Sequence, residues 1–415
     1  MIHFFQVKLY NLAIQIYHLL IKIAAAFGNP RAKDWLNGRV ETWAKLAQFE
    51  PNKKVIWVHC ASLGEFEQGR PIIEKIKAQY VDYQIVLTFF SPSGYQIRKN
   101  YELADLVCYL PIDKKQNAQN FIQKINPSIA IFVKYEFWYH HLSFLKSKQI
   151  PIYCVSAVFR PNQVFFKWYG GFFKRMLQQF TTIFVQQETD KKLLQTIDIQ
   201  AIVSGDTRVD RVANQAQFVK NIPIVEAFCD KNQVLVCGST WPKDETILNT
   251  LFERLSTNYK IILAPHEIDE KHIENITKTL TVSYIRYSEV KENTNFESIK
   301  VLIIDNIGML SSIYQYGKIA YIGGGFGKGI HNTLEPLAFG LPVIIGPKYQ
   351  SFSEAKILTR TTPSAMFSVK NEAELISIFE FLQLKNNYKS SSEVASQFII
   401  QNKGATADIL KHIFS

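Results

Sequence analysis

Short apolar runs alternate with amphipathic stretches along most of this chain. The runs are rich in Ile and Val and are apolar at consecutive positions, rather than at every second one. This pattern is typical of parallel strands buried on both faces, and the amphipathic stretches between them predict helices. The strands predicted in the first half of the chain are residues 54–59, 84–90, 106–110, 128–135, 152–157 and 182–186.

A second series of the same kind follows, with predicted strands at residues 233–237, 260–264, 282–286, 300–304, 318–322 and 342–345. Two such series predict an α/β protein with two Rossmann-like parallel-sheet domains. The ligand sites of such domains lie at the C-terminal ends of their strands, so we expect the two domains to face a shared cleft. Residues 205–210 are interpreted as a linker between the series.

The domain boundaries follow from this division, and 415 residues suit two or three domains. We expect a membrane-associating helix at residues 1–28, an N-terminal α/β domain at 29–208 and a C-terminal α/β domain at 209–385. Residues 386–415 are predicted to be helical, and their return to the N-terminal domain is one option.

Residues 4–27 form an apolar stretch that two lysines, Lys8 and Lys22, interrupt. The apolar positions recur at helical spacing, which favours an amphipathic or tilted anchor on the inner membrane surface over an ordinary core helix. Whether this helix spans the bilayer is open. Basic residues that suit an anionic surface follow it, namely Arg31, Lys33, Arg39, Lys45, Lys53 and Lys54.

The net charge of +11 favours an anionic partner. Such a partner is a membrane surface, a phosphorylated substrate or a nucleic acid. The five cysteines form no C-x-x-C pair, so buried free thiols in a reducing compartment are expected. We find no His/Asp cluster with metal-ligand spacing and no D-x-D pair at a strand end. No Ser-His-Asp set can be argued from spacing.

The stretch from 321 to 347 carries the clearest candidate chemistry. Glycines between a strand and a helix let backbone N–H groups approach an anion, here at Gly324 and Gly325. Glu335 is placed one turn into the helix that follows, where a carboxylate can take two ribose hydroxyls, and Lys328 and His331 can meet a phosphate. The spacing matches neither the P-loop nor a G-x-G-x-x-G turn. A glycine-rich turn that serves packing alone is the alternative.

Other polar residues stand at the ends of predicted strands. Glu65 is a candidate general base, or a first-turn Glu stabilised by the helix dipole. Glu136 either ligates a substrate or caps neighbouring N–H groups. Candidate anion contacts, each with an ordinary N-cap or structural alternative, are Ser91, Ser93, Gly94, Ser239, Thr240 and His266.

Seven stretches of this chain, taken in order, resemble the 3-deoxy-D-manno-octulosonic acid (Kdo) transferases of lipopolysaccharide assembly, which have the GT-B glycosyltransferase fold. They are Trp57-Val58-His59 through Glu65, Thr88 through Gly94, Tyr109 to Asp113, Tyr135-Glu136-Phe137-Trp138, Val203 to Asp206, Gly238-Ser239-Thr240, and Gly323 through His331-Asn332-Thr333-Leu334-Glu335-Pro336.

The resemblance implies that Glu65 is the catalytic base and that Glu136 serves the acceptor side. It also implies that residues 331–336 bind the cytidine nucleotide, with Glu335 at the ribose. Many members read Pro-Arg-His where this chain has His266 after Pro265, so the residue that replaces a phosphate-binding Arg is open. The implied donor-binding set is Ser239, Thr240, His266, Gly324, Gly325, Lys328, His331, Asn332, Thr333 and Glu335.

The resulting hypothesis is an inverting transferase that moves Kdo from CMP-Kdo to a lipid A precursor, lipid IVA, at the cytoplasmic face of the inner membrane. The N-terminal domain would take the acceptor and the C-terminal domain CMP-Kdo, with no cofactor, metal or nucleic acid. Alternatives are another GT-B enzyme, such as a UDP-sugar transferase or a 2-epimerase, and a basic nucleic-acid-binding protein. A dehydrogenase is disfavoured because no G-x-G-x-x-G follows the first strand of either domain.

Overall fold

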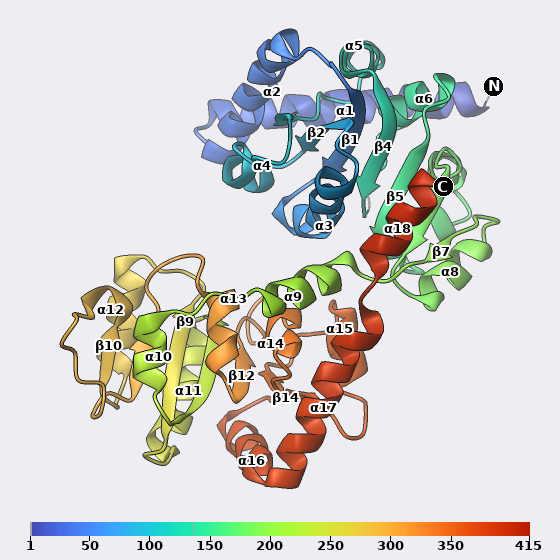
Figure 1. The fold of residues 1–415 in the computed structure, drawn as a ribbon. Coiled ribbons are helices and arrows are strands. Elements are labelled where there is room, and N and C mark those ends of the chain that lie inside the picture. The colour runs from blue at the N-terminus through green and yellow to red at the C-terminus, as the bar shows by residue number, and fades with distance from the viewer. Residues whose placement is uncertain (1, 135) are drawn as a thin grey trace. The chain divides into compact units, whose positions relative to one another are not determined.

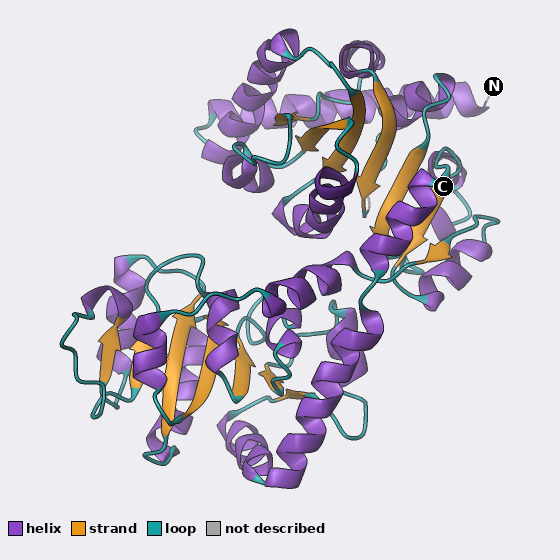
Figure 2. Cartoon of the chain, viewed as in Figure 1, coloured by secondary structure: helices purple, strands orange, loops and turns teal. Residues whose placement is uncertain are grey.

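A computed structural model describes residues 2–134 and 136–415 and divides the chain into two compact units. Unit 1 ends at Asp210 and regains Lys403–Ser415, and unit 2 is Arg211–Asn402. Each unit is built on a seven-stranded sheet with parallel pairing throughout (Figures 1 and 2). The prediction of two parallel α/β domains is confirmed. The end of the strand predicted at 128–135 lies outside the described residues.

In unit 1 the first strand lies inside the sheet, beside the middle strand β4, because the sheet order is β3-β2-β1-β4-β5-β6-β7, a doubly wound arrangement. Consecutive residues of β1 point to opposite faces, and both faces are buried. Trp57 packs into one core, and Ile56 and Val58 pack into the other. The strands are β1 (Lys54–Cys60), β2 (Tyr83–Phe89), β3 (Leu106–Tyr109), β4 (Pro127–Val133), β5 (Ile152–Ala157), β6 (Thr182–Val185) and β7 (Ile202–Val203).

Helices cover both faces of this sheet. Helices α3, α4 and α18 supply one core, and α2, α5, α6, α7 and α8 supply the other. Helix α18 closes on α3, where the Phe414 and Tyr80 rings stack 3.8 Å apart. The helices are α1 (Ile2–Ala26), α2 (Pro30–Gln48), α3 (Leu63–Gln79), α4 (Pro92–Arg98), α5 (Lys115–Ile125), α6 (Tyr139–Ser147), α7 (Gly171–Leu177), α8 (Glu188–Gln195) and α18 (Ala405–Phe414).

Unit 2 repeats the design with the sheet order β10-β11-β9-β8-β12-β13-β14. Its strands are β8 (Gln233–Thr240), β9 (Tyr259–Pro265), β10 (Tyr284–Arg286), β11 (Val301–Ile303), β12 (Ile319–Ile322), β13 (Val343–Ile345) and β14 (Met366–Ser368). Its helices are α10 (Pro223–Cys229), α11 (Pro242–Arg254), α12 (Glu270–Thr279), α13 (Leu310–Ile313), α14 (Leu334–Ala338), α15 (Ser353–Leu358), α16 (Glu372–Gln383) and α17 (Lys385–Asn402).

Three local predictions differ from the structure. The short strands β7 and β14 were missed, because two or three residues at a sheet edge are too few to show a periodicity. Strand β10 begins at Tyr284 rather than at 282. Residues 205–210, interpreted as a linker, include the start of α9 (Thr207–Gln217), where buried Thr207 donates a hydrogen bond to the Gln68 carbonyl at 2.6 Å.

Helix α1 turns most of its apolar residues away from unit 1. Phe5 is 68% exposed and Leu9 58% exposed, which is not how an ordinary core helix packs. Only a narrow strip of the helix surface contacts the rest of unit 1. On this strip the Tyr10 hydroxyl donates to Asp113 Oδ2 at 2.5 Å, and Ile14 is buried. Residues Phe4–Ala26 are long and apolar enough to cross a membrane by length and composition.

Two of the basic residues expected at the surface after this helix point inward. The Arg39 guanidinium is buried 3.5 Å over the Trp35 ring, and it donates to the Trp35 carbonyl. Lys45 Nζ donates to the Tyr95 hydroxyl at 2.7 Å. The expectation for these two is therefore wrong, because aromatic rings and carbonyls of unit 1 satisfy their charge. The exposed members of the set are Arg31, Lys33, Lys53 and Lys54.

Candidate functional site

Glu65 lies just beyond the C-terminal end of β1, an interior strand of unit 1. The turn after β1 places Ser62 at the N-cap of α3 and Glu65 in the first helical turn, where the helix dipole favours a carboxylate. The Ser62 hydroxyl donates to Glu65 Oε2, and the Glu65 side chain is half-buried. A carboxylate held in this way keeps lone pairs available to accept a proton from a substrate hydroxyl.

The turn after β2 lies beside the turn after β1. The N–H groups of Phe90 and Ser91 both donate to the Ala61 carbonyl, at 3.1 and 2.7 Å. Ser91 caps α4, and a Cβ at Gly94 would stand 2.4 Å from the Phe89 ring, so only glycine fits there. The hydroxyl oxygens of Ser91 and Ser93 lie 3.0 Å apart. Two hydroxyl groups that can donate or accept a hydrogen bond therefore stand at this edge of the sheet.

Glu136 belongs to a hydrogen-bond network that joins β1, β2 and the segment after β4. Its Oε2 accepts from Trp138 Nε1 at 2.8 Å and lies 3.4 Å from His59 Nε2. Trp57 Nε1 donates to Thr88 Oγ1, so that hydroxyl can donate onward to His59 Nδ1. His59 then presents Nε2–H to Glu136. The sequence had not singled out His59 as a site residue, because it stands in an apolar strand without a paired motif.

The charges of three carboxylates of unit 1 act on one buried thiol, that of Cys60. Burial raises the pKa of Cys60 well above its usual value, and the charges of Glu65, Glu136 and Glu67 raise it further. Glu67 is engaged elsewhere, since Arg98 Nη2 donates to its Oε1 at 3.2 Å. That ion pair makes Glu67 a weaker candidate for a general base than Glu65. All five cysteines are free and buried, as predicted.

In unit 2 the glycines after β12 bring the backbone of the protein against itself. A Cβ at Gly323 would lie 2.4 Å from the Ser239 carbonyl oxygen, and one at Gly325 would lie 2.6 Å from Gly346 Cα. Side chains at these positions would collide with backbone, which cannot move aside cheaply. Close packing of backbone against backbone therefore requires glycine at both positions.

The Asp244 carboxylate holds the same turn in place by accepting hydrogen bonds. Its Oδ2 accepts the N–H of Gly324 at 2.8 Å and that of Trp241 at 3.0 Å, and its Oδ1 accepts from the Tyr321 hydroxyl at 2.7 Å. The N–H expected to meet an anion at Gly324 is therefore bound to Asp244. Burial raises the pKa of Asp244, and these hydrogen bonds oppose that rise. Sequence spacing did not reveal Asp244, which lies far along the chain from the turn.

Three aromatic rings stack beside the glycine turn. The His266 ring lies 4.9 Å from Trp241 and 4.1 Å from His331, both nearly parallel to it. Trp241 Nε1 donates to His331 Nε2 at 2.8 Å. Burial and, to a smaller extent, the neighbouring His266 lower the pKa of His331 to about 4. At neutral pH His331 is therefore an uncharged hydrogen-bond acceptor rather than a cation for a phosphate.

The depressed pKa of His331 predicts that unit 2 loses stability in acid. Between about pH 6.5 and pH 4 the unfolded chain binds a proton at this residue that the folded chain does not, so stability falls as pH falls. The effect should reach roughly 1–2 kcal/mol after allowance for partial exposure. Urea unfolding of the protein and of His331→Gln at pH 7 and pH 4.5 measures it. An equal loss in both proteins would contradict the prediction.

The residues after the turn differ in burial, since Asn332 and Glu335 are partly exposed and Thr333 is buried. Asn332 Nδ2 donates to Glu335 Oε1 at 2.9 Å, and Asn332 Oδ1 accepts the Leu334 N–H, which fixes both side chains at the start of α14. Thr333 is fully buried and donates to Glu354, which favours a structural role. Lys328 lies within the glycine turn itself, and its side chain is exposed.

The β8–α11 turn differs from an ordinary capped helix start. Trp241 is the N-cap of α11, so the alternative of Ser239 as the cap is wrong. Ser239 instead adopts a left-handed backbone with φ 54°. Thr240 is buried, and its hydroxyl donates to Glu245 Oε1 at 3.0 Å. Of these two hydroxyls, only that of Ser239 is partly exposed.

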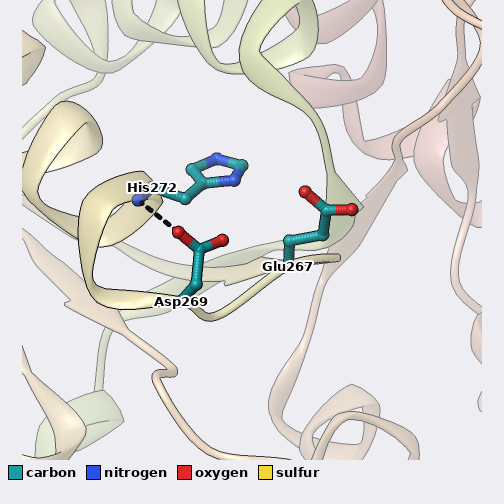
Figure 3. A group of neighbouring side chains, drawn as sticks. All are labelled: Glu267, Asp269 and His272. Carbon is teal, nitrogen blue, oxygen red and sulfur yellow. Dashed lines mark hydrogen bonds between the residues drawn. The ribbon is translucent and has the colours of Figure 1, made fainter. Parts of the chain in front are cut away.

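One side-chain cluster was not expected from the sequence. Glu267, Asp269 and His272 follow β9, and each offers a ligand atom within 4.8 Å of the others (Figure 3). Their spacing, E-x-D-x-x-H, gives no metal signature by itself. The bend between β9 and α12 brings the three together.

The family comparison matches residues 36–211 to the domain described as 3-Deoxy-D-manno-octulosonic-acid transferase (kdotransferase). The 3-deoxy-D-manno-octulosonic acid transferase of Aquifex aeolicus is 29% identical over 81% of this chain and 88% of its own length. The corresponding transferase of Rickettsia felis is 26% identical over 87% of this chain and 79% of its own.

A bifunctional glycosyltransferase/methyltransferase of Fusobacterium nucleatum is 27% identical over 95% of this chain, which spans 63% of that relative's length. Among solved structures, UDP-GlcNAc 2-epimerase of Neisseria meningitidis matches with a TM-score of 0.62 at 16% identity, covering 87% of this chain and 99% of its own. MurG of Acinetobacter baumannii matches at 0.56 and 10%, with the same coverage. At such identities the two structures show a shared fold and nothing of activity.

The two kinds of comparison agree with the architecture. The matched domain contains Glu65, Glu136 and the turns around them, and the relatives extend the similarity through unit 2. The solved structures support the expected GT-B fold class. Residues 36–211 of this chain therefore match the 3-deoxy-D-manno-octulosonic acid (Kdo) transferase domain, and most of its length is similar to transferases of that name.

Proposed function

We propose that this protein transfers Kdo from CMP-Kdo to a hydroxyl of lipid IVA, a tetra-acylated lipid A precursor, with inversion at the anomeric carbon. The observation that carries the proposal is Glu65, a half-buried carboxylate fixed by Ser62 just after strand β1, inside the family-matched domain. In this position a carboxylate can act as general base for an attacking hydroxyl.

The reaction balances with the groups present. Glu65 takes the proton of the acceptor hydroxyl as its oxygen bonds to the anomeric carbon, and the bond from that carbon to the CMP phosphate oxygen breaks. CMP leaves as a phosphate monoester. Glu136 is held by Trp138 and His59, so we assign it to positioning on the acceptor side, along with the hydroxyls of Ser91 and Ser93.

We assign donor recognition to unit 2. Glu335 would accept the ribose hydroxyls and Asn332 would hold it in place. The leaving phosphate needs a positive charge or N–H donors. Lys328 is favoured for this role over His331 and His266, since burial lowers the pKa of both histidines. The two histidine rings instead offer a stacking surface with Trp241.

We further propose that α1 attaches the protein to the cytoplasmic face of the inner membrane. Its outward residues are apolar and exposed, namely Phe5, Leu9, Leu12, Ile16, Leu19, Leu20 and Ile23. Burying such a face in the lipid interface removes apolar area from water. The net charge of +11 adds attraction to anionic lipid.

A single assay tests the transfer. The purified full chain is mixed with CMP-Kdo and lipid IVA in detergent micelles, and the lipid products are read by mass spectrometry. We expect lipid IVA carrying Kdo, and inhibition by CMP but not by UDP. Absence of a Kdo adduct, or competition by UDP in place of CMP, would reject the proposed reaction in favour of another nucleotide-sugar enzyme.

A further inference from the structure

The cluster after β9 has the composition of a metal site rather than of a solvated acidic surface. Glu267 and Asp269 are exposed carboxylates, whereas the His272 side chain is only 9% exposed. In Figure 3 the imidazole of His272 and the two carboxylate groups lie around a common space, with the ring above Asp269 and beside Glu267. All three line a cavity of about 300 Å³ together with Glu245 of α11. A buried imidazole that opens onto a cavity bordered by carboxylates is arranged to accept a cation.

Glu245 makes the imidazole a defined ligand. His272 Nε2 lies 3.0 Å from Glu245 Oε2 and 3.1 Å from Oε1, and the Glu245 side chain is also 9% exposed. Because Nε2–H donates its hydrogen bond to this carboxylate, the lone pair of the neutral ring lies on Nδ1. Nδ1 has no hydrogen-bond partner within the described residues. A carboxylate behind a histidine is how metal-binding histidines are held and oriented.

Asp269 can bind an ion without giving up its structural task. One oxygen, Oδ1, caps α12 by accepting the His272 N–H at 3.2 Å, which leaves Oδ2 for an ion. Ligand atoms around one divalent ion stand about 3–3.5 Å apart, given bonds of about 2.0–2.2 Å. The exposed side chains of Glu267 and Asp269 can close from the observed spread of up to 4.8 Å by rotation.

We propose that Glu267, Asp269 and His272 bind a divalent transition-metal ion, with Glu245 as the positioning carboxylate behind His272. One imidazole nitrogen with two carboxylate oxygens suits Zn²⁺ or Mn²⁺ better than Ca²⁺ or Mg²⁺, which prefer oxygen ligands alone. The ion takes no part in a chemical step. It fastens the bend between β9 and α12 directly after His266, and so holds one edge of the ring stack in place.

The test measures metal binding itself and stands independently of the proposed reaction. The full chain, freed of any affinity tag, is titrated calorimetrically with Zn²⁺ and, separately, with Mg²⁺. We expect one equivalent of Zn²⁺ to bind, with Mg²⁺ at least tenfold weaker. The five cysteines are buried, so they do not compete at the surface. Failure to bind Zn²⁺, or equal affinity for Mg²⁺, overturns the site.

Variants locate the ion. The double variant Glu267→Gln, Asp269→Asn removes both charges, while Asn preserves the helix cap, and it should weaken Zn²⁺ binding at least a hundredfold. Glu245→Gln should weaken it about 10–100-fold, as for other residues behind a ligand. The matched control is Glu274→Gln, because Glu274 lies on α12 and pairs with Lys278 outside the cluster. Unchanged affinity in the double variant, or an equal loss in the control, rules the site out.

Discussion

Replacing Glu65 with Gln is expected to lower kcat for Kdo transfer by about 10²–10⁴-fold, the usual contribution of a positioned general base. An amide cannot take the proton of the acceptor hydroxyl, so the attacking oxygen stays a poor nucleophile. The change keeps the size of the side chain and an oxygen that can accept from Ser62, which should preserve the turn. Steady-state turnover with CMP-Kdo and lipid IVA measures the loss.

A binding measurement and a control variant test whether this result is specific to Glu65. CMP binding to Glu65→Gln, followed by calorimetry, should equal that of the parent, because nucleotide recognition is assigned to unit 2. Glu67→Gln is the matched control, since Glu67 lies two residues further along α3 and already pairs with Arg98. It should retain activity within about tenfold. Near-parental turnover in Glu65→Gln would remove this residue from the role of base.

Replacing Glu335 with Gln is expected to weaken CMP binding about 10–100-fold, since a hydrogen bond to a charged group contributes about 1.5–3 kcal/mol. The carboxylate would accept both ribose hydroxyls, whereas the amide offers only one acceptor atom. Gln keeps an oxygen that can accept from Asn332 Nδ2, so the start of α14 should stay intact. Calorimetric titration with CMP gives the dissociation constant.

The control for Glu335→Gln is Glu372→Gln, an exposed first-turn residue of α16 in the same unit. Its affinity for CMP should match the parent. Thermal unfolding of both variants should also match the parent, which would separate a lost contact from a damaged fold. An unchanged CMP affinity in Glu335→Gln would move ribose recognition to another residue of unit 2.

The buried strands were predictable because their chemistry is local. A strand such as β1 is covered by helices on both faces, so nearly every residue must be apolar, and the run stands out from its neighbours. The edge strands β7 and β14 lack this signal, since two or three residues carry no periodicity. Helix α1 was predictable as amphipathic, but only packing showed that its apolar side is the exposed one.

The residues of the candidate site likewise differ in whether the sequence alone could reveal their role. Glu65 was found because a glycine and a carboxylate directly follow the first strand, and the C-terminal ends of parallel strands collect ligand sites. The charge state of His331 was not visible in sequence, because it depends on burial beside His266 and Trp241. Burial likewise turned Thr240 and Thr333 from candidate ligands into supports for Glu245 and Glu354.

By itself, the sequence determined the two α/β series, the family resemblance and the carboxylate at the end of the first strand, since each depends on residues close together along the chain. Only the tertiary structure decided which polar groups meet. His59 reaches Glu136, Asp244 reaches Gly324, and Glu245 reaches His272 across 77, 80 and 27 residues. The physical reason is that hydrogen bonding and burial depend on distance in space, and strand order, not sequence spacing, sets that distance.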